Sequence, residues 1–332
     1  MTGSRFFRRR QEHDHSERFF YHSFPRRGHS TSKETEKGCK ILSLICEAGL
    51  ILAPEVVAWS HPHADGTPPR TAQVIQRRIC FTELAPGELA EHAKEFGNFA
   101  LEFDVHTLKR LGAMPVFYIP LATGDNTDGV RSLGSTLVLQ SIDAMMLAMR
   151  LVELKKIVDD PSSPPSVEIV LGNDRPQAFQ LNVSETRKVL EALAYAITPA
   201  DMMEHALTGL VSCFYPADNL RNDSALAYYR QREWRIAWNF AINDVDVMRR
   251  PCDELIARLL EIDADFFGRD FPTMSDPRQL ASEALVFPGI ANKRIIEMVN
   301  RVVVPRAALA SARTIVARFA PSIPVVCIED VK

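Results

Sequence analysis

Several signatures of nucleotide-binding and hydrolytic enzymes are missing from this sequence of 332 residues. It contains no glycine-rich phosphate loop and no Gly-x-Gly-x-x-Gly pattern, which argues against a P-loop or Rossmann enzyme. It also lacks Gly-x-Ser-x-Gly, the strand-to-helix turn that carries the nucleophile of α/β-hydrolases. Function therefore has to be argued from other residues.

Cysteine pairs and a strong net charge are also absent. The six cysteines are scattered and none forms a Cys-x-x-Cys pair, so we expect reduced, buried thiols rather than a zinc ribbon. No cluster of acidic or cysteine ligands accompanies His61 and His63 in the sequence, so no metal site is expected. The formal net charge of −3 predicts no general attraction to nucleic acid or to anionic membranes.

No apolar run is long enough to cross a bilayer. The most apolar long stretch, residues 41–59, is interrupted by Glu47, Pro54 and Glu55. Residues 1–10 contain arginines but no apolar segment follows them, so they do not form a secretory signal. We therefore expect no membrane association and a cytoplasmic location.

Residues 77–120 predict the centre of an α+β domain. Residues 79–82, 99–103 and 115–120 are short apolar or alternating segments typical of strands. Short helices are predicted over residues 90–95 and 105–111. This succession favours a central mixed or antiparallel sheet with flanking helices.

The rest of the chain adds an arm and an insertion. Residues 1–17 are highly charged and are expected to form a flexible N-terminal arm. Residues 18–332 are expected to form a single α+β domain, with a helical and hairpin subdomain inserted over residues 131–222. Within this insertion, apolar residues at helical spacing predict a long core helix over residues 137–156.

Motifs in this central stretch are similar to those of a bacterial family. They occur in the order Cys80-Phe81-Thr82-Glu83, His92, Phe96-Gly97-Asn98-Phe99-Ala100-Leu101-Glu102-Phe103 and Met114-Pro115-Val116-Phe117-Tyr118, followed by Tyr229-Arg230-Gln231-Arg232-Glu233-Trp234-Arg235. In this order they resemble AbiGi-type abortive-infection proteins. The resemblance implies a component of a phage-defence or toxin–antitoxin module.

A further resemblance, at the level of the fold, is to ADP-ribosyltransferases, and it implies NAD as a substrate. It places an early histidine, His22 or His29, against the nicotinamide ribose, and Thr82 against the nicotinamide. Glu233 would accept a hydrogen bond from the ribose 2′-hydroxyl and stabilise the oxocarbenium ion. Gln231 with Glu233 is similar to the Gln-x-Glu pair before the catalytic strand of several such enzymes, and Arg235 is placed among the NAD-binding residues.

Each of these residues also has a purely structural interpretation. Glu233 can form an ion pair with Arg232 or Arg235 at a strand edge. His22, within an aromatic run, can be a hydrogen-bonded core residue, and Thr82 can be a strand-end hydroxyl bonded to backbone. His92 can be an ordinary histidine on a helix face.

A second hypothesis comes from another functional class. AbiGi-type proteins are commonly described as antitoxins, which implies a chain that binds and neutralises a partner toxin. Glu233-Trp234-Arg235 would then be structural. An active enzyme would instead pass ADP-ribose to a macromolecular target or to water.

Overall fold

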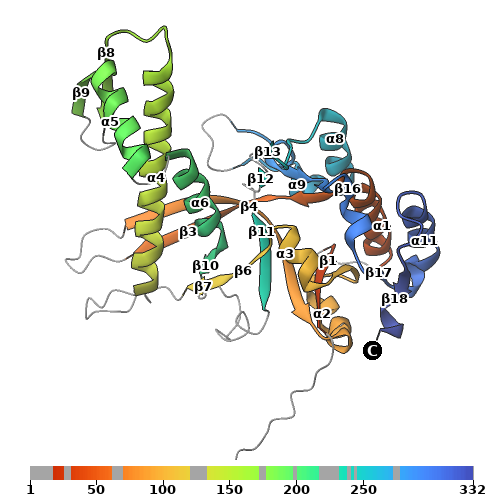
Figure 1. Cartoon of the computed structure of the whole chain (residues 1–332). Helices are drawn as coiled ribbons and strands as arrows, with labels where there is room; N and C mark the ends of the chain where they lie inside the picture. Colours follow the sequence, from red (N-terminus) through yellow and green to blue (C-terminus); the bar gives the residue numbers. More distant parts are fainter. Residues whose placement is uncertain are drawn as a thin grey trace, which may run out of the picture. The chain divides into compact units, whose positions relative to one another are not determined.

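The structure is a computed structural model, and it describes residues 18–25, 31–61, 70–119, 133–171, 177–196, 200–216, 232–237, 241–242, 245–271 and 277–331 (Figure 1). It has an α+β fold with a mixed sheet, which confirms the predicted class. The chain divides into two compact units. Unit 1 is Met1–Cys46, Phe81–Leu108 and Ile296–Lys332, and unit 2 is Glu47–Cys80 and Lys109–Ile295. The predicted arm over residues 1–17 lies outside the described residues.

Unit 1 is built on a mixed sheet in which one pair of strands is parallel and the others are antiparallel. The parallel pair is β17 (Arg301–Val304) with β18 (Val325–Cys327), and β5 (Phe99–Phe103) joins β17 to β1 (Phe19–Phe24). In spatial order the strands are β18 (Val325–Cys327), β17 (Arg301–Val304), β5 (Phe99–Phe103), β1 (Phe19–Phe24) and the end of β4 (Arg70–Leu84).

Helices cover both faces of this sheet, which is why every residue of β5 is buried. On one face, Ala100 packs with Tyr21 and with Leu89 of α2 (Leu89–Phe96). On the other face, α1 (Thr31–Ala48) passes so close that a methyl group added at Gly38 would lie 2.2 Å from the ring of Phe99. Unit 1 also contains η1 (Pro86–Glu88), α3 (Val105–Arg110), η3 (Arg306–Ala308), α11 (Leu309–Ala317) and η4 (Ile328–Asp330).

Unit 2 contains a long antiparallel hairpin that the sequence analysis did not predict. β3 (Pro54–His61) pairs with the first part of β4, with Val57 opposite Val74. Trp59 and Val74 are buried against Val138 of α4 (Leu133–Asp159) and Val211 of α6 (Ala200–Cys213). This cluster is the core that supports the candidate site.

The helical part of unit 2 has the predicted elements. α4 packs against α5 (Val183–Ala196) and α6, and the hairpin of β8 (Ser166–Leu171) and β9 (Gln177–Asn182) lies at one end of α4 next to α5 (Figure 1). The described residues of the predicted insertion, from 133 to 216, all belong to unit 2.

Short elements complete unit 2. β2 (Leu50–Leu52) pairs antiparallel with β14 (Leu285–Phe287), and β7 (Phe117–Ile119) pairs parallel with β10 (Phe214–Pro216). The remaining elements are β6 (Met114–Pro115), β11 (Glu233–Ala237), β12 (Ala241–Ile242), β13 (Val245–Asp246), α8 (Asp253–Ile262), α9 (Ala264–Phe267), α10 (Leu280–Glu283), β15 (Gly289–Ile290) and β16 (Lys293–Arg294), with η2 (Ile295–Met298) at its boundary. Among the helices that the structure describes, none is both long and apolar enough to cross a membrane.

Candidate functional site

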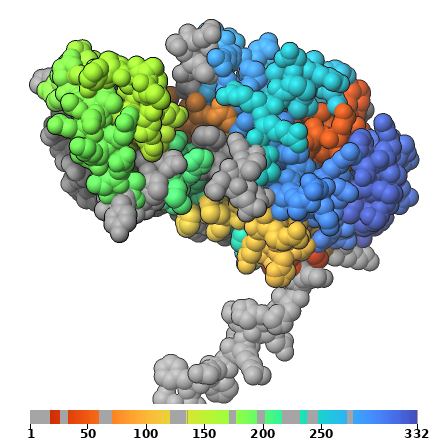
Figure 2. Space-filling view, turned by 45° about the horizontal axis from the view of Figure 1, so that its top comes forward, coloured from red at the N-terminus to blue at the C-terminus, as the bar shows by residue number. Residues whose placement is uncertain are grey.

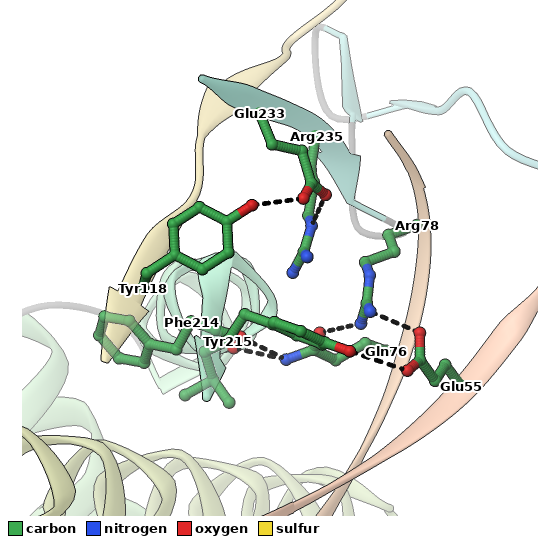
Figure 3. Close-up of polar contacts among 9 residues, drawn as sticks. Glu55, Gln76, Arg78, Tyr118, Phe214, Tyr215, Glu233 and Arg235 are labelled. Carbon is green, nitrogen blue, oxygen red and sulfur yellow. Dashed lines mark hydrogen bonds and ion pairs between the residues drawn. The ribbon is translucent and has the colours of Figure 1, made fainter. Parts of the chain in front are cut away.

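A buried carboxylate, Glu233, forms the centre of the candidate site in unit 2 (Figure 3). The hydroxyl of Tyr118 donates a hydrogen bond to Glu233 Oε2 at 2.6 Å. Arg235 Nε donates to Glu233 Oε1 at 2.7 Å. Both carboxylate oxygens therefore have a partner, and the charge of Glu233 is neutralised by an adjacent guanidinium that is itself only 2% exposed.

Strand geometry brings these three side chains together. Glu233 and Arg235 are two residues apart on β11, so their side chains point to the same face. β11 pairs antiparallel with β6, and the amide of Val116 donates to the carbonyl of Glu233 at 2.9 Å. This pairing places β7, which follows β6 directly, so that Tyr118 reaches the carboxylate.

The environment keeps Glu233 ionised. Burial alone would raise its pKa, but the charge of Arg235 and the hydrogen bonds from Arg235, Cys80 and Tyr118 outweigh burial and hold the pKa below its usual range. Burial and the nearby carboxylate raise the pKa of the Cys80 thiol to about 11 and also raise the pKa of Tyr118. Both side chains are therefore protonated donors to Glu233 at neutral pH.

A second layer of contacts surrounds Tyr215, which lies opposite Tyr118 in the β7–β10 pair. The guanidinium carbons of Arg78 and Arg235 lie 4.9 and 4.7 Å from the centre of the Tyr215 ring, within cation–π range. Arg78 also donates to Glu55 and to Gln76 (Figure 3). The site thus combines two arginines, two carboxylates and two tyrosine rings.

One polar atom of this site lacks a partner. Arg235 Nη1 is buried and makes no hydrogen bond within the part of the chain that the structure describes. A buried donor without an acceptor destabilises the fold by about 1–3 kcal/mol, so such atoms usually meet a water molecule or a ligand. The open donor distinguishes this site from an ordinary internal ion pair.

A similar network in unit 1 provides a structural comparison. There, Tyr21 donates to Glu102 Oε2 at 2.6 Å, and Arg301 Nε donates to the same oxygen at 2.7 Å. Glu102 is buried in the sheet core, and among the described residues no buried guanidinium nitrogen beside it lacks a hydrogen-bond partner. A tyrosine–glutamate–arginine network by itself is therefore compatible with a purely structural role.

Thr82 and His92 form a separate cluster in unit 1. His92 Nε2 lies 3.2 Å from the hydroxyl of Thr82, and its Nδ1 lies 3.5 Å from the hydroxyl of Ser23. The imidazole stacks on Phe96 with ring centres 4.4 Å apart. Burial lowers the pKa of His92 to about 4, so the ring is neutral at pH 7.

The predicted site residues fall into two groups. Glu233 and Arg235 lie together in unit 2, and the ion pair between them is the structural alternative that the sequence offered. His22 and Thr82 lie in unit 1, where His22 packs against Phe24 and Phe81. His29 and Gln231 lie outside the described residues. The convergence of histidine, hydroxyl and carboxylate on one cleft stays a prediction.

Sequence reasoning missed the roles of Tyr118, Tyr215 and Arg78. Tyr118 closes the Met-Pro-Val-x-Tyr motif, and this was the one signal that could have singled it out. Tyr215 and Arg78 belong to no motif, and only the pairing of distant strands brings them to Glu233 and Arg235.

Comparison with known proteins adds no assignment: no family model, no curated protein and no solved structure matches this chain. In the described ranges, no group of three or more histidine, cysteine, aspartate or glutamate side chains is arranged to hold a metal ion. The chemistry of the site therefore has to be argued from its own residues.

Replacing Glu233 with glutamine should destabilise the protein strongly, because the guanidinium of Arg235 would remain buried without a counter-charge. We expect a loss of about 3–5 kcal/mol in the free energy of unfolding, measured by urea titration. Glu153→Gln is the control, since its pair with Arg150 is exposed at the surface and should contribute less than about 1 kcal/mol. Equal effects of the two substitutions would contradict a buried, charge-compensating role for Glu233.

His92 should make stability depend on pH. Its pKa is about 4 in the folded protein, whereas the ordinary pKa of a histidine is 6.5, so the unfolded chain binds the extra proton more readily. The contribution of neutral His92 to the free energy of unfolding is fully present above pH 6.5. The free energy of unfolding falls by about 2–3 kcal/mol as the pH drops from 6.5 towards 4. His92→Gln should flatten this slope. A slope that survives His92→Gln would show that another group is responsible.

Proposed function

We propose that this chain is a component of a bacterial abortive-infection or toxin–antitoxin system, in which it binds and neutralises a partner toxin. Two observations support the proposal. The ordered motifs of the central stretch resemble AbiGi-type proteins, and most of the large apolar side chains that are exposed among the described residues belong to the helical and hairpin part of unit 2. The exposed apolar side chains of unit 2 are the reason for which we prefer binding over catalysis.

Large apolar side chains are exposed along one region of unit 2. Among the residues that the structure describes, all the exposed large apolar side chains except Met114 and Phe117 lie between residues 137 and 210. Figure 2 shows the surface of this region in green. The partner surface, as we define it, consists of Leu137, Met146, Leu147, Met149, Ile157, Val170, Phe179, Val189, Leu193, Met202 and Leu210.

Helix α4 illustrates why this surface indicates a partner. One side of α4 is already buried in the unit 2 core through Val138, Ile142 and Met145. Other positions of the same helix leave Leu147 60% and Leu137 50% exposed. A helix that is apolar beyond its core-facing side normally buries that surface, and extended apolar patches on proteins mark interaction sites.

The chemistry of this surface fits a protein partner. The charged residues of α4 beside this apolar surface carry both signs. Arg150 forms an exposed pair with Glu153, and Lys155 forms another with Asp159. No strip of positive charge runs along α4, whereas nucleic acid binding depends on such charge. In this proposal Glu233 stabilises unit 2 and takes no part in chemistry, in keeping with its two occupied oxygens.

Changing the partner surface should abolish toxin neutralisation. We expect Leu147→Asp combined with Leu193→Asp to weaken the complex with the proposed partner toxin at least 100-fold, because two apolar contacts are lost. The measurement is titration of the two purified proteins, together with growth of cells that express both. Lys156→Gln, at an exposed charged position of the same helix, is the control.

Three outcomes would contradict this proposal. One is an unchanged affinity for the double variant, provided that its melting temperature matches that of the wild type. The second is failure of the wild-type chain to bind the toxin. The third is a dimer of the chain alone that the same two substitutions dissociate, since the surface would then bind a second copy.

A second candidate function is NAD-dependent ADP-ribosyl transfer by a fold similar to ADP-ribosyltransferases, and one specific observation favours it. Glu233 is an ionised carboxylate, and the two tyrosine rings and the open Nη1 of Arg235 lie around it. A carboxylate of this kind can stabilise an oxocarbenium ion, and a guanidinium can bind a phosphate oxygen. Transfer would break the nicotinamide–ribose bond and join C1′ of ADP-ribose to an acceptor nucleophile or to water.

NAD labelled in the nicotinamide ring tests this candidate directly. If it is correct, the wild-type chain releases labelled nicotinamide and Glu233→Asp, which keeps the charge, lowers the rate at least 100-fold. The matched control is Glu102→Asp in the equivalent network of unit 1, which should leave the rate unchanged if the variant is folded. Absence of release by the wild-type chain, with and without lysate protein as acceptor, would leave only the binding function.

A further inference from the structure

Three arginines surround one buried carboxylate at a second position in unit 2. Glu283, at the end of α10, is 3% exposed. Arg77 of β4 donates to its Oε2 at 2.7 Å through Nη2 and to its backbone carbonyl at 2.7 Å through Nε. Arg278 Nη1 lies 3.3 Å and Arg250 Nη1 lies 3.7 Å from the other oxygen, Oε1.

The local fold fixes this arrangement. Arg249 and Val286 exchange backbone hydrogen bonds of 3.1 and 2.8 Å, which anchors the backbone beside Arg250 next to β14. The backbone of Gln279, which follows Arg278, forms an isolated antiparallel β-bridge with that of Asp270. The amide of Leu280 donates to the carbonyl of Arg269. Arg250 and Arg278 therefore come from separate, hydrogen-bonded segments that converge on α10.

The charges of this cluster do not balance. Arg77 alone neutralises Glu283 and forms its shortest contact, so the two other guanidiniums leave a local excess of two positive charges. Arg250 and Arg278 are 65% and 51% exposed, and within the described residues neither has an ion pair with any other acid. By contrast, Arg258 with Glu47 and Arg150 with Glu153 are one-to-one pairs.

We propose that Arg250 and Arg278 bind a phosphate dianion at this position, either inorganic phosphate or the terminal group of a phosphate monoester. Because both Nη1 atoms point to the same carboxylate oxygen, the two guanidiniums lie close enough together to bind one small anion with their remaining N–H groups. A phosphate monoester carries a charge of about −1.5 to −2 at pH 7 and has three acceptor oxygens, which matches the excess charge of this arginine pair. Arginine binds phosphate in a bidentate manner that lysine does not reproduce.

This site is independent of the proposed functions. It uses neither Glu233 and Arg235 nor the partner surface, so its failure would leave both candidates untouched. The ligand we infer is small: inorganic phosphate itself, or a metabolite with a terminal phosphate such as a nucleoside monophosphate.

Calorimetric titration of the full chain at low ionic strength tests the proposal. The probes are inorganic phosphate, AMP and adenosine, of which adenosine lacks the phosphate. We expect saturable binding of AMP or of phosphate at pH 7.5, no binding of adenosine, and affinity that decreases at pH 5 as the phosphate gains a proton. AMP bound more tightly than phosphate would identify a nucleotide as the source.

Variants locate the site. Arg250→Gln and Arg278→Gln should each weaken binding at least tenfold, because each removes charge-assisted hydrogen bonds. Arg258→Gln is the matched control on the same unit and should bind like the wild type. The proposal is overturned if phosphate and AMP show no saturable binding, if the arginine variants and the control bind equally, or if adenosine binds as tightly as AMP.

Discussion

The pairing of Glu233 with Arg235 is the interaction on which unit 2 depends most. Two opposite charges that are buried within one strand cannot be separated without leaving one of them uncompensated in a medium that solvates charge poorly. The pair brings with it Tyr118 from β7, and through the Arg235 guanidinium it also contacts Tyr215 from β10. Strands that lie far apart in the sequence are thus joined through one carboxylate.

The pairing of Glu233 with Arg235 also bears on the choice between a structural and a catalytic role for this carboxylate. In unit 1, Glu102 joins strands by accepting hydrogen bonds from Tyr21 and Arg301 on one oxygen. Glu233 is also well suited to hold strands together, because each of its two oxygens accepts a strong hydrogen bond. For catalysis, one of these oxygens would have to exchange its protein partner for a substrate hydroxyl. The exposed apolar residues of α4, α5 and α6 require no such rearrangement to bind a protein, and this favours the antitoxin proposal over the enzymatic one.

Local patterns predicted much of the fold but not its long-range pairings. The alternation of residues 99–103 and the apolar spacing of residues 137–156 mark β5 and α4 correctly, because these signals come from neighbouring residues. The β3–β4 hairpin was missed because residues 60–70 are polar and the buried Gln76 interrupts the apolar pattern of β4. Glu233 and Arg235 were found through a motif, whereas the contact of Glu233 with Tyr118, 115 residues away, depends on strand register that no local pattern encodes.

The protonation state of Glu233 tests the central claim most directly. The carboxyl carbon of Glu233 can be followed by nuclear magnetic resonance of protein labelled with carbon-13 at glutamate, and assigned by comparison with the Glu233→Asp variant. If Arg235, Tyr118 and Cys80 hold the pKa below its ordinary 4.5, this resonance keeps the chemical shift of an ionised carboxylate as the pH falls through 4.5, while exposed glutamates titrate. A Glu233 resonance that titrates at or above pH 4.5 would contradict the account, because burial and not the arginine would then control the carboxylate.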